Sequence, residues 1–337
     1  MGKNIENQFM RPMARRFILI ILKIAITSGL AWYLFNEIDL EQSALYLASF
    51  NVEWGIFALF ILFLLFFIGT TRWLIYLRAL RIPLQIGPAF HIYLISQFFG
   101  QALPAGVGGD AVRIWLLTKH GTTLGPSASS VILERLTGLL GMLILITTLL
   151  PLTFNYVTDH EARIGIGLIL VICIVVISII IGLSFVPNLI NKSLNYALLS
   201  KLAQAAQEAR KTGLMLKTGL MVTMLSITMH LLAVFAVYLL ARGINVDLSL
   251  SASLALVPVV ILMSTMPISL AGWGVREGTM VVALQYANIE PSKSLALSIL
   301  FGLSLLAVSS LGGLLWLVHE RKKRPHTKDN QTGITPS

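Results

Sequence analysis

The chain has 337 residues, of which 56% are hydrophobic and 12% are charged, and its mean hydropathy is +0.83. Because ordinary globular domains carry roughly 25% charged residues, this composition excludes a soluble enzyme domain and predicts a membrane protein. The formal net charge of +10 does not indicate a nucleic-acid partner, since Lys and Arg cluster in short segments beside apolar runs. The single cysteine, Cys173, excludes an intramolecular disulfide.

Six long apolar runs follow a basic first segment, residues 1–16. A helix needs about 20 apolar residues to cross a bilayer, so each run predicts a spanning helix. The runs are 17–35, 55–79, 128–151, 163–186, 214–241 and 294–318. No small-residue cleavage site follows the first run, which indicates a retained helix rather than a signal peptide.

Two further apolar stretches, 88–117 and 249–286, are interrupted near their middles by clusters of Pro and Gly. Such interruptions predict broken, re-entrant elements rather than straight spans. If both elements cross instead, the crossings number eight. The predicted fold class is therefore an all-α polytopic membrane protein, with a single membrane domain over 17–320.

Positive charges predict the orientation of the chain, because cytoplasmic loops carry an excess of Lys and Arg. The basic segment 1–16 and the basic tail 321–337 place both termini in the cytoplasm, whereas the loop 36–54 carries only acidic charges. Residues 188–212 have the pattern of a weakly amphipathic helix on the cytoplasmic surface. The composition of the tail predicts disorder.

One short motif, P-x4-G-x3-R, occurs in both broken stretches. It comprises Pro104, Gly109 and Arg113 in the first stretch, and Pro267, Gly272 and Arg276 in the second. The spacing divides the membrane domain into halves of about 17–151 and 163–318, which begin on opposite sides of the membrane. This is the pattern of an inverted-topology repeat, in which two broken helices build a central binding site.

The broken elements also predict a polar cavity, because unpaired backbone groups survive at membrane depth only inside protein or beside water. Two arginines would hold an anionic group there, and a helix that begins after glycines offers it free N–H groups. The candidate substrate-binding residues are Arg113, Arg276, Gln101, Gly108, Gly109, Gly272, Trp273 and Gly274. The alternative is that Pro and Gly only kink packed helices and that the arginines are interface anchors.

Several other charged residues lie within or beside the apolar stretches. The candidates for ion coupling or gating are Asp110, Glu134, Arg135 and Glu277, although Asp110 lies three residues before Arg113 and a purely structural ion pair is equally compatible with that spacing. His230 is more typical of a hydrogen-bonded packing residue than of a proton relay. Lys23 and Arg72 are near enough to helix ends to extend to the membrane surface.

Three ordered motifs carry a resemblance to a known family: FFGQALPAGVGGDAVR at 98–113, ERLTG at 134–138 and SLAGWGVREG at 269–278. Together they resemble the flippase-like membrane domain of the lysylphosphatidylglycerol synthase family, over roughly residues 15–320. The resemblance implies a multi-pass protein of the inner (plasma) membrane that handles polar lipids. A soluble synthase domain is not expected here, because the sequence ends soon after the last apolar run. The resemblance does not identify the lipid.

Three functions are compatible with the sequence. The leading hypothesis is a transporter that moves a polar or anionic lipid between leaflets, with no catalytic residue, metal or cofactor, since the sequence contains no ATP-binding motif and no His/Cys metal set. The second is a membrane-embedded transferase that modifies a lipid. The third is an accessory subunit of a lipid-modifying enzyme. The expected partners are a membrane lipid and, for the third hypothesis, that enzyme; the sequence does not predict the oligomeric state.

Overall fold

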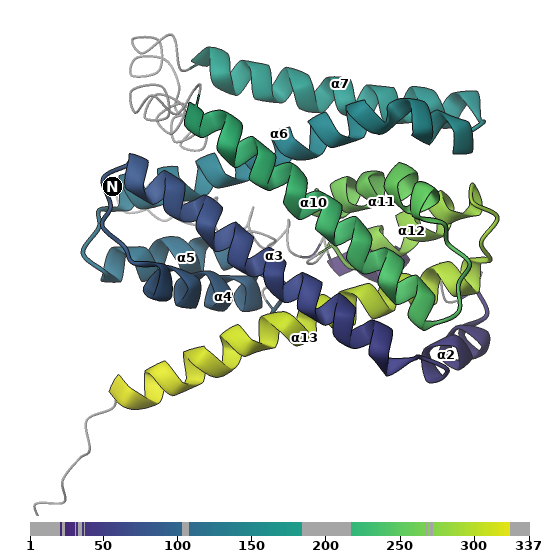
Figure 1. Cartoon of the computed structure of the whole chain (residues 1–337), viewed down its shortest axis with the longest axis horizontal. Coiled ribbons are helices and arrows are strands. Elements are labelled where there is room, and N and C mark those ends of the chain that lie inside the picture. The colour runs from purple at the N-terminus through teal and green to yellow at the C-terminus, as the bar shows by residue number, and fades with distance from the viewer. Residues whose placement is uncertain are drawn as a thin grey trace, which may run out of the picture.

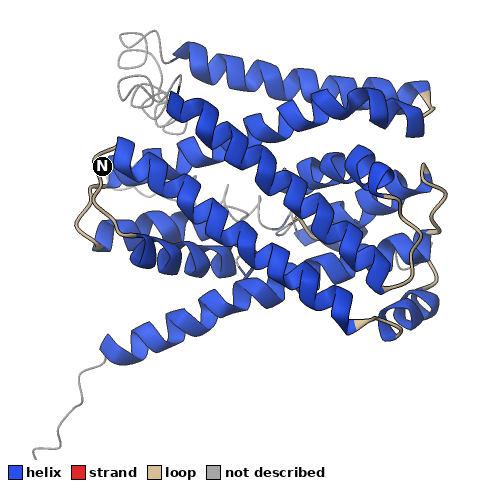
Figure 2. Cartoon of the chain, in the orientation of Figure 1, coloured by secondary structure: helices blue, strands red, loops and turns tan. Residues whose placement is uncertain are grey.

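The structure is a computed structural model of the whole chain, and it describes residues 38–102, 108–183, 217–266 and 272–323. Ser269 and single residues or short pieces between 21 and 36 are also described. Every element in these residues is a helix, joined by turns and loops (Figure 2). Pro104, Pro267 and the predicted surface helix 188–212 lie outside the described residues, as does most of the first apolar run.

Five described helices are long and apolar enough to cross a membrane. They are α3 (Val52–Ala79), α6 (Leu124–Tyr156), α7 (His160–Leu183), α10 (Lys217–Gly243) and α13 (Pro291–Lys323). They coincide with five of the six runs predicted to span, and several begin or end a few residues beyond the run. The multi-pass membrane fold is therefore confirmed.

The two broken stretches form pairs of shorter helices. The first pair is α4 (Ile86–Ala102) with α5 (Gly108–Lys119), and the second is α11 (Leu250–Thr265) with α12 (Val275–Gln285). The two helices of each pair pack against each other. The predicted interruptions are confirmed, whereas re-entry to the same side of the membrane stays a prediction. A short helix, α2 (Leu40–Ala48), precedes α3.

Glycine allows the close approach of α4 and α5. A Cβ atom added to Gly109 would lie 2.2 Å from the backbone oxygen of Ser96 and 3.0 Å from the Cα of Gly100. No other residue fits there without a shift of the backbone, because Cβ contacts below 3 Å are essentially never found. Gly109, just after the first break, is therefore required by packing.

The packing of the helices is matched between the two halves of the chain. If α3, α4, α5 and α6 correspond to α10, α11, α12 and α13, each contact among these eight helices has a counterpart, whereas the contacts of α2 with α13 and of α6 with α7 lie outside this scheme. In each of the following cases the first contact corresponds to the second: α3 with α4 to α10 with α11; α4 with α5 to α11 with α12; α5 with α6 to α12 with α13; α3 with α6 to α10 with α13; α4 with α13 to α11 with α6; and α3 with α13 to α10 with α6. This packing supports the inverted repeat inferred from the P-x4-G-x3-R motif.

The corresponding helices α3 and α10 lie side by side and run in opposite directions (Figure 1). The backbone N–H of Asn51, which precedes α3, donates to the carbonyl of Gly243 at the end of α10 over 2.8 Å. At the other end of the pair, Arg72 of α3 contacts Ser226 of α10. Opposite directions are what an inverted repeat requires of its equivalent elements.

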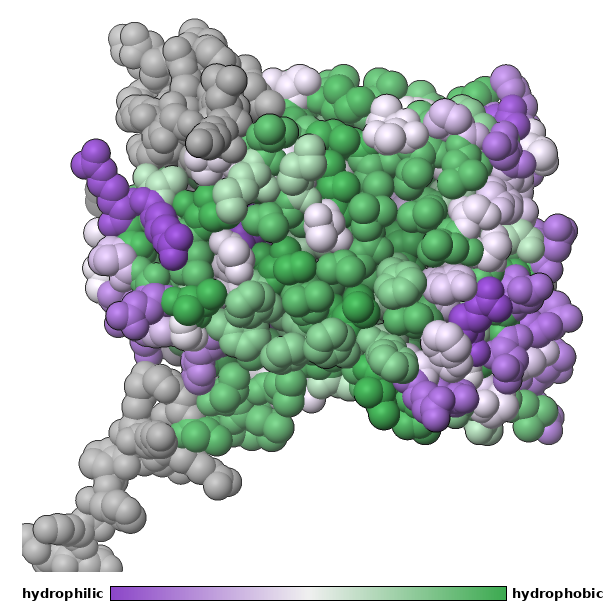
Figure 3. Space-filling model, viewed as in Figure 1, coloured by the Kyte–Doolittle hydropathy of each residue, from purple (hydrophilic) through white to green (hydrophobic). Residues whose placement is uncertain are grey.

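The surface has an apolar band between two polar ends (Figure 3). One end is acidic on balance: three basic residues, Arg163, Arg242 and Lys293, lie there among a larger number of carboxylates. These carboxylates are Asp39, Glu41, Glu53, Asp159, Glu161, Asp247 and Glu290. At the other end, where α10 begins and α13 ends, lie the basic residues Arg78, Arg81 and Lys119. Aromatic and aliphatic side chains on α3 and α7 are exposed in the band, as expected for a surface that faces lipid.

Candidate functional site

A cavity of about 500 Å³, here called the central cavity, lies between the two helix pairs. The first pair and α6 contribute Gln97, Gly100, Gln101, Asp110 and Arg135, and the second pair contributes Ser264, Thr265, Met266, Ser269, Gly272 and Arg276. Side chains of α3, α10 and α13 complete its wall. Its volume is within the range of about 300–1,000 Å³ that is usual for ligand sites. The broken elements therefore meet at a polar cavity, as the sequence predicts.

Arg276 is the cavity arginine of the second half. It is only 4% exposed, and its Nη2 atom donates to Oε1 of Glu277 over 2.7 Å. The guanidinium also lies over the ring of Trp273, with 4.5 Å between Cζ and the ring centroid. A Cβ on Gly302 would lie 2.1 Å from Arg276 Nη2, so α13 accommodates the guanidinium only because that residue is glycine.

Glu277 holds the start of α12 in place. Its Oε2 atom accepts a hydrogen bond of 2.6 Å from the backbone N–H of Gly274, and Ser298 lies 3.4 Å from Oε1. Gly274 itself has φ of +83°, a conformation that disfavours residues with a Cβ. The prediction that this helix start offers free N–H groups to an anion is wrong for Gly274, because the Glu277 carboxylate already accepts from it.

Five charged side chains of the first half form one ionic network, which joins α3, α5 and α6. Glu134 accepts from Arg72 Nη2 on one oxygen and from Arg113 Nη2 on the other, the second contact measuring 2.9 Å. Asp110 accepts from Arg113 over 3.0 Å and from Arg135 Nε over 2.9 Å. Three guanidinium groups and two carboxylates leave this network with one excess positive charge.

Arg113 lies behind the cavity wall rather than in it. The residue is 2% exposed, and its guanidinium is positioned 5.2 Å from the centroid of Trp73 and 5.1 Å from that of Tyr93. Its Nε and Nη1 atoms are buried and have no hydrogen-bond partner in the described part of the chain. The two arginines of the repeated motif therefore differ, since Arg276 lines the central cavity and Arg113 does not.

Two predictions about buried polar groups have different outcomes. Arg72 was expected to extend to the membrane surface, and this is wrong: it is 6% exposed and donates to Ser226 over 2.7 Å as well as to Glu134. The ion pair with Glu134 keeps the Arg72 side chain inside the protein. The position of Arg72 in its apolar run does not reveal this partner. His230 is a packing residue, since its Nε2 atom lies 3.0 Å from the carbonyl oxygen of Gly138. Lys23 lies outside the described residues.

The remaining predicted site residues fall into three positions. Gln101, Asp110, Arg135 and Gly272 line the central cavity, whereas Gly108 and Gly109 are buried at the start of α5. Glu134 and Glu277 are buried against their arginine partners. Sequence reasoning missed Ser269, whose buried Oγ lines the cavity without a hydrogen-bond partner among the described residues. The position of Ser269 two residues after Pro267, beside the second break, could have indicated that it lines the cavity.

Within the described residues, no group of three or more His, Cys, Asp or Glu side chains is placed to hold a metal ion.

Comparisons with known proteins identify the family of the chain. A search of curated proteins finds no match. A family profile described as the lysylphosphatidylglycerol synthase TM region matches residues 20–313. The chain therefore belongs to the family of lysylphosphatidylglycerol synthase transmembrane regions.

Proposed function

We propose that this protein moves an anionic lipid between the leaflets of the plasma membrane, with the headgroup bound in the central cavity. The observation that carries the proposal is the position of Arg276, a buried arginine at the wall of a cavity enclosed by both halves of the chain. A charged side chain at membrane depth is costly, and it usually faces a substrate path. Arginine binds phosphate oxygens through parallel N–H groups.

The charges around the cavity favour an anionic headgroup over a neutral or cationic one. The network of Arg72, Asp110, Arg113, Glu134 and Arg135 has an excess positive charge, and Arg276 with Glu277 is neutral. Arg135 is the least buried member, with 56% of its side chain exposed, and it lines the cavity. Together Arg135 and Arg276 supply donors from opposite halves, and the Oγ of Ser269, which has no hydrogen-bond partner among the described residues, adds a third.

The matched packing of the halves supports alternating access. Two inverted helix pairs can exchange roles, so that each in turn opens the cavity toward one leaflet. Movement would be passive or coupled to an ion through Asp110, Glu134 or Glu277. The basic end of the structure would face the cytoplasm, together with both termini, and the acidic end would face outward.

Reconstitution in vesicles tests the proposal directly. The purified protein should accelerate the movement of fluorescent phosphatidylglycerol to the leaflet in which dithionite quenches it, and Arg276→Ala should lower that rate about ten-fold, as expected for the loss of a charge-assisted hydrogen bond. Arg78→Ala, at an exposed position outside the cavity, is the matched control. Rates equal to those of protein-free vesicles for phosphatidylglycerol, phosphatidylcholine and an isoprenoid phosphate would refute transport.

A second variant tests the choice of an anionic headgroup. Arg135→Ala removes the exposed guanidinium and leaves Asp110 paired with Arg113. The rate for phosphatidylglycerol should fall toward the rate for phosphatidylcholine, which should change little. A transferase would instead give a modified lipid with purified protein, and an accessory subunit would tolerate Arg276→Ala without a cellular phenotype.

A further inference from the structure

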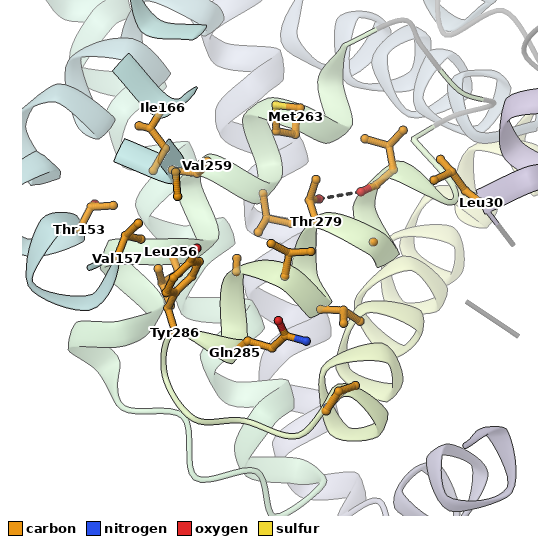
Figure 4. A pocket seen from close by; sticks show the side chains of 18 of the residues that line it. Leu30, Thr153, Val157, Ile166, Leu256, Val259, Met263, Thr279, Gln285 and Tyr286 are labelled. Atoms are coloured by element: carbon orange, nitrogen blue, oxygen red, sulfur yellow. Dashed lines mark hydrogen bonds between the residues drawn. The ribbon is translucent and has the colours of Figure 1, made fainter. Parts of the chain in front are cut away.

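A second cavity, here called the apolar cavity, has a volume of about 690 Å³ and lies on the other face of the α11–α12 pair. Its wall includes Leu256, Val259 and Met263 of α11 and Gly278 of α12, and α6 and α7 close the side away from the pair (Figure 4). None of its described lining residues carries a charge. The same two helices thus separate a polar cavity from an apolar one.

Three of the four polar side chains of the apolar cavity are bonded within the protein, and the fourth, Gln285, is exposed at the last residue of α12. Thr153 donates to the carbonyl of Ala255 over 2.9 Å, and Thr279 donates to that of Val275 over 2.6 Å. The hydroxyl of Tyr286 donates to Asp159 over 2.8 Å, which ties the end of α12 to the start of α7. With these groups satisfied, the cavity offers a ligand chiefly dispersion contacts and the exclusion of water.

The length of the apolar cavity matches one leaflet of a membrane. It extends along α12 from Gly274, at the break, to Tyr286, at the acidic end. At a rise of 1.5 Å per residue these positions are about 18 Å apart, and half of a bilayer's hydrocarbon core is about 15 Å thick. Val282 lines the cavity and is 57% exposed, which places it at the rim, where the cavity meets the surface of the molecule.

We propose that the apolar cavity binds a hydrocarbon chain of the lipid whose headgroup occupies the central cavity. This inference rests on the proposed function and deepens it, because the protein then holds the chain instead of leaving it in the bilayer. Gly274 and Val275 face the apolar cavity, while Gly272 and Arg276 face the central one. The start of α12 is therefore the point at which headgroup and chain diverge.

Photocrosslinking tests the chain site without measuring transport. The probe is phosphatidylglycerol with a diazirine near the end of one acyl chain, incorporated in vesicles with the full-length protein. Adducts on α11 and α12 that face the cavity should fall at least five-fold in Gly278→Phe, because a side chain added at Gly278 enters open space inside the cavity. Gly165→Phe on α7, also in open space but outside the cavity lining, should leave them unchanged.

The outcomes separate the chain site from transport. Adducts confined to the lipid-facing surface of α7, or equally abundant in Gly278→Phe and Gly165→Phe, would overturn the chain site even if vesicles show rapid lipid movement. Adducts in the cavity that Gly278→Phe removes would support it even if no lipid moves, in which case the proposed function fails alone. If Gly278→Phe does not fold, Val282→Trp at the rim replaces it and should likewise lower the amount of adduct in the apolar cavity.

Discussion

Arg113 donates a hydrogen bond of 2.9 Å to Glu134, and both side chains are almost completely buried. The pair joins the helix that follows the first break to the long helix α6, and Arg72 adds α3 to the same carboxylate. One carboxylate thus holds two guanidinium groups, of which Arg72 has no other carboxylate partner among the described residues and Arg113 has only Asp110 besides. This network is a structural support for the central cavity.

Glu134→Gln should therefore destabilise the protein strongly. The substitution keeps the shape of the side chain but removes the anionic partner of Arg72 and leaves Arg113 with Asp110 alone. Removal of one member of a buried ion pair costs about 3 kcal/mol. Thermal unfolding in detergent should show a clear fall in Tm. Glu161→Gln, an exposed change in the first turn of α7, should leave Tm unchanged. Equal Tm values for the two variants would contradict the supporting role.

Gly302→Ala should impair transport without unfolding the protein. The added methyl group would lie 2.1 Å from Arg276 Nη2, and the guanidinium at the end of a flexible side chain can move away from it. We expect a transport rate about ten-fold lower, the size of effect that follows from losing a hydrogen bond of a charged group. The flipping assay and a melting curve measure the two effects, and Gly167→Ala on α7 is the control. A normal rate in Gly302→Ala would show that the position of Arg276 is not critical.

Gly109→Ala should act on the fold instead. Its new Cβ would meet the backbone oxygen of Ser96 at 2.2 Å, and backbone cannot move aside as a side chain does, so α4 and α5 must separate. Overpacking of this kind costs about 1–3 kcal/mol. Gly125→Ala, in open space on α6, should instead be neutral or slightly stabilising. The comparison is made by the Tm of the two purified proteins.

The orientation of the chain can be measured by cysteine labelling. In a Cys173→Ala background, Glu53→Cys should react with a membrane-impermeant maleimide on intact cells, because Glu53 belongs to the acidic end. Thr123→Cys, exposed at the opposite end before α6, should react only after permeabilisation. The reverse pattern would show that the positive charges do not set the orientation.

Hydropathy and glycine patterns predicted the elements of the fold, but not the roles of the individual charges. Five predicted spans and both interrupted elements could be read from the sequence because lipid tolerates so few backbone arrangements. Arg72 could not be placed from its neighbours, since its partners Glu134 and Ser226 belong to distant helices. Likewise, one motif gives Arg113 and Arg276 the same local context, although only the second lines the central cavity. Arg113 lies instead against the rings of Trp73 and Tyr93, which come from α3 and α4.

The matched halves carry unmatched charge, and this bears on how the proposed transporter would bind a headgroup from each side. A frame with two equivalent halves and equal charge would present the same energy profile to a headgroup from either side. Here a network with a surplus cation faces a neutral arginine–glutamate pair across one cavity. The proposed transporter would therefore bind a headgroup with a different affinity from each side, although without an energy source its inward and outward rates stay equal at equal lipid concentrations in the two leaflets.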